Sequence, residues 1–236
     1  MLKDLQTSGL GLRRIDLFKG LADERFEAIA RRCVWRNFAS GTQVVSRKSS
    51  DCTVYLLVSG KVRVTIYSAA GRQVTFHDYA SGEFFGELAA IDEMPRSADV
   101  VALESSVLAS MPAEAFRKLL RDEPALAERL LRRFAGLVRR LSERVIDLST
   151  LGVHSRIHGE LLRLARQAGV DGNVARIDPA PKHADLASQI STYREQVTRE
   201  MSALAKAGLL GKEGRALIVR DFGRLERMVE EVRAGT

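Results

Sequence analysis

Residues 82–98 decide the fold, and they read Gly-Glu-Phe-Phe-Gly-Glu-Leu-Ala-Ala-Ile-Asp-Glu-Met-Pro-Arg-Ser-Ala. Gly86 lets backbone N–H groups approach an anion closely, and Leu88 opens a predicted helical turn whose free N–H groups favour negative charge. Arg96 can hold a phosphate with two donors, and Ser97 adds a hydroxyl. Glu87 has the wrong sign for phosphate but can accept from a sugar hydroxyl. The stretch predicts a sugar-phosphate pocket, with a structural Glu87–Arg96 ion pair in a tight loop as the alternative.

The chain around this stretch has the pattern of a β domain. Val54, Leu56 and Val58 alternate with their neighbours up to the turn at Gly60, and the same alternation resumes at 62–66 and 74–76. Short strands that each end in a glycine-containing turn are typical of a sandwich or barrel. Residues 36–111 are therefore predicted as β structure, and residues 12–35 before them as helical.

A long helical segment is predicted over 113–150, after Pro112, with a break at Asp122-Glu123-Pro124. Its apolar residues step alternately by four and three, which is a period of 3.5 and favours a dimer seam over an amphipathic helix packed on its own domain. The seam positions after Ala127 are Leu131, Phe134, Val138, Leu141, Val145 and Leu148. Gly152 then marks a hinge.

A second motif begins at His183. A short helix over 183–190 is interrupted by Ser191-Thr192, and Thr192 with Glu195 matches a capping box at the start of a second helix. That helix is predicted to turn Val197, Met201 and Leu204 inward and to expose its first polar residues. Two short helices joined by a tight turn fit a DNA major groove.

The exposed residues of the second helix suit base reading. Arg194 or Arg199 could donate two hydrogen bonds to guanine, and Glu195 could accept from cytosine N4. The alternative is that Glu195 only caps the helix and that the arginines are only solvated.

Composition limits the class of protein. The 236 residues carry a formal net charge of +7, which favours an anionic partner. No apolar run approaches the roughly 20 residues of a membrane span, residues 1–14 do not resemble a secretory signal, and two cysteines are too few for a disulfide framework. We therefore expect a reduced, cytoplasmic protein without a membrane partner.

Enzymatic chemistry is not indicated. The chain has no Ser-His-Asp order, no metal-ligand spacing and no phosphate-binding Walker loop, so no catalytic residue and no metal site is predicted. His154 and His158 lie four residues apart on a predicted helix, but two ligands are a weak metal site. His77 is interpreted as an ordinary strand histidine rather than a haem ligand.

Taken in order, these features resemble the cyclic-AMP receptor protein and fumarate-nitrate regulator family of bacterial transcription factors. The resemblance covers about residues 15–220 and rests on 82–88, on Pro-Arg-Ser-Ala at 95–98 and on Arg-Glu-Gln-Val-Thr-Arg at 194–199. It implies an α+β fold with an N-terminal β-roll (jelly roll) that binds a cyclic nucleotide over 1–112, a dimerisation helix over 113–151, and a C-terminal winged helix-turn-helix over 152–236. The hairpin at 211–219 would be the wing.

The resemblance also implies roles for individual residues. Glu87 would hold the ribose 2′-hydroxyl, and Arg96 and Ser97 the cyclic phosphate. The implied ligand-binding residues are Gly86, Glu87, Leu88, Arg96, Ser97, Leu141, Ser142 and Arg144. The implied DNA-binding residues are Thr192, Arg194, Glu195, Thr198 and Arg199. The expected partners are double-stranded DNA, a second copy of the chain, cyclic AMP or cyclic GMP as a noncovalent effector, and RNA polymerase.

Three features depart from the family pattern. Ser142-Glu143 stands where nucleotide-responsive members have a Thr-Ser pair that contacts the purine. Ser191 replaces the glycine of the helix-turn-helix turn, at some cost in backbone ease. Glu200 stands where the pattern has an apolar residue, and we expect it to reach solvent at the rim.

Two alternatives stay open at this point. The pocket could be vestigial or serve another signal, so that the protein binds DNA without a ligand or senses cyclic di-GMP or haem. In a different class, the basic surface could serve a protein or membrane partner.

Overall fold

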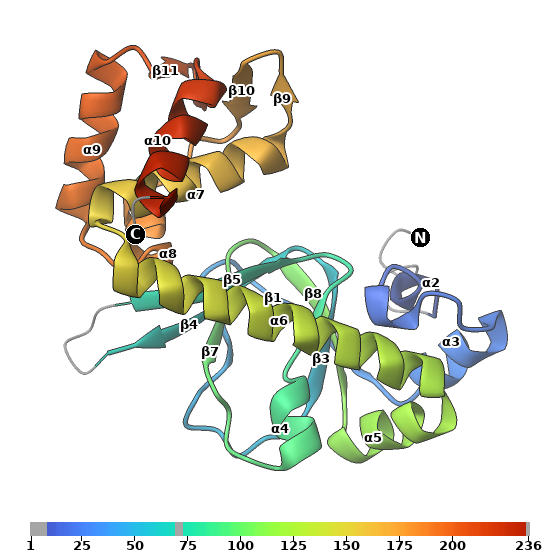
Figure 1. Ribbon diagram of the computed structural model, residues 1–236. Coiled ribbons are helices and arrows are strands. Elements are labelled where there is room, and N and C mark those ends of the chain that lie inside the picture. Colours follow the sequence, from blue (N-terminus) through green and yellow to red (C-terminus); the bar gives the residue numbers. More distant parts are fainter. Residues whose placement is uncertain (1–8, 69–72, 235–236) are drawn as a thin grey trace. The chain divides into compact units, whose positions relative to one another are not determined.

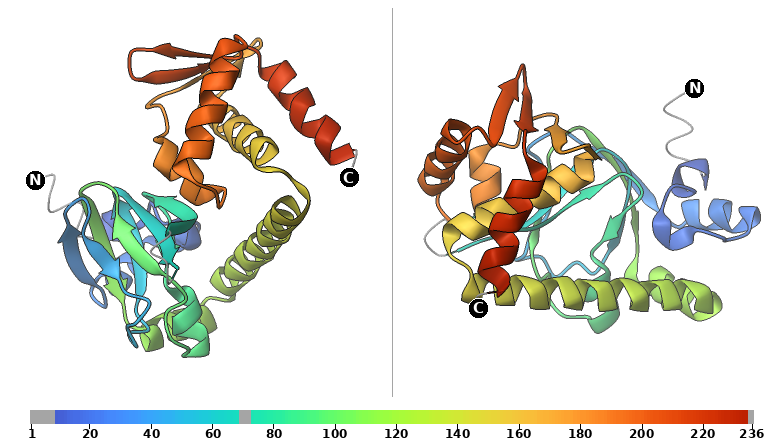
Figure 2. Two further views of the ribbon diagram at one scale, coloured as in Figure 1. Left: turned by 90° about the vertical axis from the view of Figure 1, so that its left-hand side faces the viewer. Right: turned by 45° about the horizontal axis from the view of Figure 1, so that its top comes forward.

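The computed structural model describes residues 9–68 and 73–234 (Figures 1 and 2). Its contacts divide the chain into two compact units, Met1–Gly136 and Leu137–Thr236. One long helix, α6 (Pro124–Thr150), begins in the first unit and ends in the second. Each unit has its own hydrophobic core.

The first unit is a β-roll flanked by helices. Its two sheets have the strand orders β1-β8-β3-β6 and β2-β7-β4-β5, with antiparallel neighbours. The strands are β1 (Val34–Phe38), β2 (Gln43–Val45), β3 (Val54–Ser59), β4 (Lys61–Tyr67), β5 (Gln73–Ala80), β6 (Phe84–Phe85), β7 (Asp99–Ala102) and β8 (Ser106–Met111). The helical segments are α2 (Gly9–Leu12), a 3-10 turn at Asp16–Phe18, α3 (Asp23–Ala30), α4 (Glu87–Asp92) and α5 (Ala113–Asp122).

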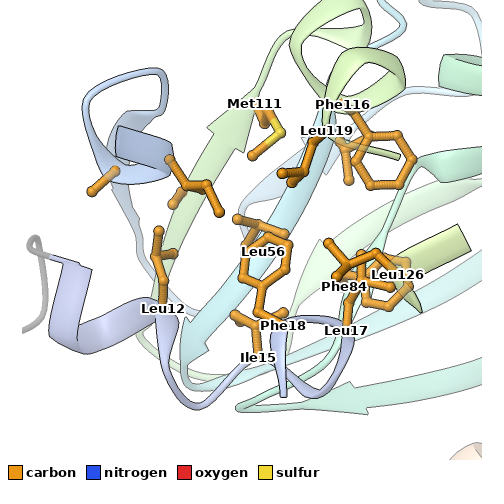
Figure 3. Packing of buried hydrophobic residues seen from close by; sticks show 14 of the residues in the cluster. Leu12, Ile15, Leu17, Phe18, Leu56, Phe84, Met111, Phe116, Leu119 and Leu126 are labelled. Carbon is orange, nitrogen blue, oxygen red and sulfur yellow. The ribbon is translucent and has the colours of Figure 1, made fainter. Parts of the chain in front are cut away.

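Strand β3 is buried on both faces. Leu56 belongs to the cluster that the helices cover, and Leu57 belongs to the cluster between the two sheets. Figure 3 shows the first cluster, in which Phe18, Phe84 and Phe116 converge from the N-terminal segment, the β-roll and α5. The predicted alternation of β3 is therefore only partly right, because both of its faces meet apolar partners.

The N-terminal prediction was wrong in extent. Helical structure covers only parts of residues 12–35, because Gly20 has a φ of 79° between the 3-10 turn and α3. Val34 and Trp35 pair with Ser110 and Ala109 of β8, so these two residues belong to a strand. The break after Asp122 is confirmed, since α5 ends there and α6 begins at Pro124.

The second unit is a winged helix-turn-helix. Its elements after α6 are α7 (Val153–Ala168), β9 (Val170–Asp171), β10 (Val174–Ile177), α8 (His183–Gln189), α9 (Arg194–Lys206), β11 (Leu210–Glu213), β12 (Ala216–Val219) and α10 (Phe222–Ala234). The strand order β11-β12-β10-β9 adds a second hairpin to the predicted wing. Helix α10 packs on α7 and buries Leu225 and Val229 in the same core.

The helix-turn-helix is confirmed, but its capping box was wrong. Helix α9 begins at Arg194 with Tyr193 as the N-cap, and no side chain caps it. Thr192 instead hydrogen-bonds with Gln196, and its own N–H donates to the Ala187 carbonyl. Ser191 has a φ of 57°, so the turn uses the left-handed conformation that glycine would adopt more easily.

Candidate functional site

Gly86 sits at the junction between strand β6 and helix α4. Its φ is 88°, and a Cβ there would lie 2.6 Å from Arg96 Nη1 and 2.8 Å from the Thr53 carbonyl oxygen. Both the backbone conformation and the crowding require glycine. The start of α4 therefore lies against a buried guanidinium ten residues further along the chain.

The Arg96 side chain is the centre of the site. It is only 4% exposed. Nη1 donates to the Gly86 carbonyl (3.1 Å), and Nη2 donates to the Thr53 carbonyl (2.7 Å) and to Asp51 Oδ2 (2.8 Å). Among the described residues, Arg96 Nε is the buried side-chain donor that lacks a hydrogen-bond partner. An unpaired buried donor is costly, so this guanidinium has unused capacity for an acceptor.

Asp51 is a member of the site that the sequence reasoning missed. Its carboxylate accepts from Arg96, from the Thr53 N–H (2.9 Å) and from the Tyr55 hydroxyl (3.2 Å). Burial would raise the pKa of Asp51, but hydrogen bonds from Thr53 and Arg96 overcome this and leave the pKa below its ordinary value. Arg96 therefore pairs with Asp51 and not with Glu87, so the structural pair considered from the sequence was wrong.

Glu87 is held in a different environment. Its side chain is buried, and burial raises its pKa against the opposing charges of Arg133 and Arg96. Arg133 of α6 lies over the Phe84 ring, with its Cζ 4.0 Å from the centroid, and Nη2 donates to the Phe84 carbonyl (2.7 Å). No local pattern marked Arg133, because the contact joins residues 49 positions apart.

The remaining predicted pocket residues lie at the surface. Leu88 and Ser97 are exposed, whereas Arg96 is buried. On α6, Leu141 and Ser142 are also exposed. Arg144 instead donates to the Gln189 carbonyl at the end of α8 (2.7 Å), so its guanidinium is engaged within the second unit.

The first turns of α9 present the predicted polar face. Arg194, Glu195, Thr198 and Arg199 are exposed, while Val197, Met201 and Leu204 are buried as expected. Thr198 is hydrogen-bonded with His183 Nδ1 of α8 (2.8 Å). Thr192 is only 6% exposed, which leaves little of its surface for a DNA contact.

Glu200 does not reach solvent as expected, and that prediction was wrong. It is 9% exposed, and its Oε1 lies 2.6 Å from His158 Nε2, while Oε2 contacts His154 Nδ1. The two histidines of α7 supply the polar partners that a carboxylate needs at an otherwise apolar position. Within residues 9–68 and 73–234, no group of three His, Cys, Asp or Glu residues is arranged to hold a metal ion.

Helix α6 carries an exposed apolar stripe. Leu131, Val138 and Val145 are each more than 60% exposed, and a hollow on the helix is lined by apolar residues around Leu141 and Val145. Phe134 is the exception, because it is half-buried against the core of the first unit. None of the helices in the described part of the chain is long and apolar enough to cross a membrane.

Comparison with known proteins accounts for the presence of both a candidate pocket and a helix-turn-helix in one chain. Residues 35–123 match the cyclic nucleotide-binding domain, and residues 155–228 match the Crp-like helix-turn-helix domain. The Cyclic AMP receptor protein of Thermus thermophilus is 33% identical over 215 residues, covering 90% of this chain and 95% of the relative. The chain belongs to the cyclic-AMP receptor protein family.

A second relative agrees with this assignment, and a solved structure has the same fold. The CRP-like cAMP-activated global transcriptional regulator of Mycobacterium tuberculosis is 27% identical, covering 92% of this chain and 97% of the relative. The structure described as the c-di-GMP responsive global regulator CLP of Xanthomonas campestris has a TM-score of 0.69 at 21% identity, covering 80% and 94%. This chain is thus a DNA-binding transcription regulator with a cyclic nucleotide-binding domain.

Proposed function

We propose that this regulator works as a homodimer that binds palindromic duplex DNA under the control of a cyclic nucleotide, cyclic AMP or cyclic GMP. The observation that carries the effector assignment is the buried Arg96 guanidinium, whose Nε lacks a partner in the described structure. A buried donor of fixed positive charge, beside a glycine that permits close backbone approach, suits a cyclic phosphate.

Each cassette residue has a role in this proposal. Arg96 and Ser97 hold the phosphate, with backbone N–H groups of Gly86–Leu88, and Glu87 accepts from the ribose 2′-hydroxyl. The exposed positions Leu141 and Ser142 of α6 contact the effector's base. Arg144 is less suited to that task, because it is committed to the Gln189 carbonyl.

The dimer is supported by the exposed stripe on α6. Leu131, Val138, Leu141, Val145 and Leu148 keep the 3.5-residue period, and none is buried within its own chain. Apolar side chains in such a row are costly in water and are covered when two helices pack side by side. Phe134 belongs to the period but contributes to the core of its own unit.

The switch couples these parts. Effector contact near the seam biases the hinge around Leu151–Val153, and the two α9 helices then reach successive major grooves roughly 34 Å apart. Arg194, Glu195 and Arg199 read bases, and Thr198 adds a polar contact. Because its proposed target is duplex DNA, we infer that the protein acts in the cytoplasm, and RNA polymerase is a further proposed partner.

Calorimetry with cyclic AMP, cyclic GMP and cyclic di-GMP tests the pocket on the full chain. We expect one cyclic mononucleotide to bind, and Arg96→Ala to lower its affinity at least about 100-fold, since one charged hydrogen-bonding group is worth roughly 3 kcal/mol. The matched control is Arg47→Ala, an exposed arginine of the same unit. No heat with either mononucleotide would favour a vestigial pocket, and heat with cyclic di-GMP alone would favour the repurposed one.

A further inference from the structure

A buried carboxylate joins the DNA-reading helix to the helix that follows the hinge. His154 and His158 lie one turn apart on one face of α7, and both approach Glu200 of α9. Each histidine contacts a different carboxylate oxygen, so Glu200 is held from two points. We call these three residues the His-Glu-His clamp.

The clamp is built from groups of very different exposure. The side chains of Glu200 and His158 are 11% and 7% exposed, whereas that of His154 is 73% exposed. Burial would raise the pKa of Glu200, but the hydrogen bonds from His158 and His154 overcome this and leave the pKa below its ordinary value. The carboxylate is therefore ionised at neutral pH, and its stability in that form depends on the two rings.

The strength of the His-Glu-His clamp depends on whether its two histidine rings carry a proton. Imidazole is the side chain that changes charge near neutral pH. A neutral ring can still donate one hydrogen bond to Glu200, but a protonated ring adds an opposite charge, and charge-assisted hydrogen bonds are roughly twice as strong. A protonated ring therefore holds α9 on α7 more strongly than a neutral ring does, as long as Glu200 stays ionised.

The position of the clamp gives this change a consequence for DNA binding. His154 is the second residue of α7, directly after the Gly152 hinge. Glu200 follows Arg199, which lies on the exposed face of α9. A change in the clamp therefore acts on both the start of α7 and the base-reading turns of α9.

We propose that Glu200 is a positioning residue and that the His-Glu-His clamp makes specific DNA binding pH-dependent. Protonation of His154 or His158 fixes α9 on α7 in the DNA-reading position, and loss of the proton loosens it. This inference rests on the proposed role of α9 in reading DNA.

Other titratable groups on the packed elements must be separated from the clamp. His183 of α8 is engaged with Thr198, Glu213 of β11 with Arg176 of β10, and Glu226 of α10 with Arg166 of α7. The elements that pack on α7 or α9 carry charged or titratable residues that include Arg176, His183, Asp185, Lys212, Glu213 and Glu226. Among them His183 is the one imidazole, so its removal is the essential control.

The test measures the affinity of the full chain for DNA between about pH 6 and about pH 8, across the imidazole range. The probe is a fluorescein-labelled duplex that the wild-type protein has selected from a randomised library, measured by anisotropy at constant ionic strength with EDTA present. We expect the wild-type affinity to fall about tenfold over this range, and Glu200→Gln and His154→Gln to reduce the fall to about twofold or less. The control His183→Gln should keep the wild-type profile.

A second measurement separates a failure of the clamp from a failure of the DNA-reading role. The melting temperature of the ligand-free chain should fall with rising pH in the wild type more steeply than in Glu200→Gln. Equal pH profiles in the wild type and Glu200→Gln, or a profile abolished by His183→Gln, overturn the clamp while DNA binding stands. If the wild type selects no duplex at any pH, either alone or with cyclic AMP or cyclic GMP added, the role of α9 in reading DNA is overturned instead.

Discussion

Replacing Asp51 with asparagine should destabilise the ligand-free protein and strengthen cyclic nucleotide binding. Asp51 Oδ2 lies 2.8 Å from Arg96 Nη2, so the carboxylate partly neutralises the buried guanidinium. The same carboxylate brings a negative charge to the guanidinium that a phosphate would need. The substitution removes this charge but keeps the size of the side chain.

The expected magnitude follows from the contacts. A hydrogen bond to a charged group contributes about 1 kcal/mol more than a neutral one, and the Asp51 side chain is 38% exposed, so solvent screening reduces the loss. We expect the free energy of unfolding to fall by about 1 kcal/mol, which lowers the Tm by roughly 3 °C in a protein of this size. Because the anion no longer competes with a carboxylate, its affinity should rise about tenfold.

The pH dependence has a definite sign. The lowered pKa of Asp51 means that its contribution to stability is present above the ordinary carboxyl range and is lost as the pH falls through the folded-state pKa. The stability difference between the wild type and Asp51→Asn should therefore shrink as the pH falls and vanish once Asp51 is protonated in the folded state.

Calorimetry and thermal unfolding at neutral pH measure the two effects separately. The matched control is Asp99→Asn, because the Asp99 carboxylate accepts from neutral donors, Gln43 Nε2 and the Arg47 N–H. An unchanged or weaker affinity in Asp51→Asn would refute the reasoning, since it would make Asp51 an orienting partner of Arg96 rather than a competitor of the ligand.

Four other outcomes follow from the described contacts. Glu87→Gln should raise the Tm at neutral pH, because burial raises the pKa of Glu87 and makes its charged form costly in the folded protein. Calorimetry should show weaker cyclic nucleotide binding by the same variant. A lower Tm would contradict the stability argument. Val145→Glu should shift sedimentation from dimer to monomer, because a carboxylate in the seam is desolvated, whereas the exposed Ser149→Glu should not. Arg199→Ala should lower the affinity for the selected duplex, measured by anisotropy, by at least about tenfold. If the variant still prefers the selected duplex to other sequences as strongly as the wild type does, Arg199 does not lie on the base-reading face. Burial raises the pKa of Cys33 to about 12, so iodoacetamide should alkylate it only after unfolding; rapid labelling of the native protein would count against this.

The architecture could be predicted from sequence because its signals are local. The strand alternation around Gly60, the break at Pro124 and the turn at Ser191 each act within a few residues, and each is found where it was expected. The N-terminal helices could not be delimited in this way. Val34 and Trp35 look helical by spacing, but pairing with β8, more than 70 positions away, makes them a strand.

The sequence motif identified the predicted pocket residues, but it did not identify the residues that contact them. Arg96 was identified by its distance along the chain from Gly86, but Asp51 and Arg133 reach the site from 45 and 49 positions away. No periodicity marks such residues, because their contacts are set by the closure of the β-roll for Asp51 and by the packing of α6 on Phe84 for Arg133. Thr192 shows the opposite error, since a good local match to a capping box gave way to a hydrogen bond with Gln196.

Glu200 is a departure from the family pattern whose surroundings could not be predicted from the sequence. A lone carboxylate at an apolar position is costly when buried, so the expectation from sequence was a place at the rim. The structure buries it because His154 and His158 replace the missing solvent on two sides. The three residues therefore depend on one another. His158 without Glu200 leaves a buried polar ring without its partner, and Glu200 without the histidines leaves a buried charge. A substitution of one residue should therefore destabilise the protein least when the other two are changed to apolar residues at the same time.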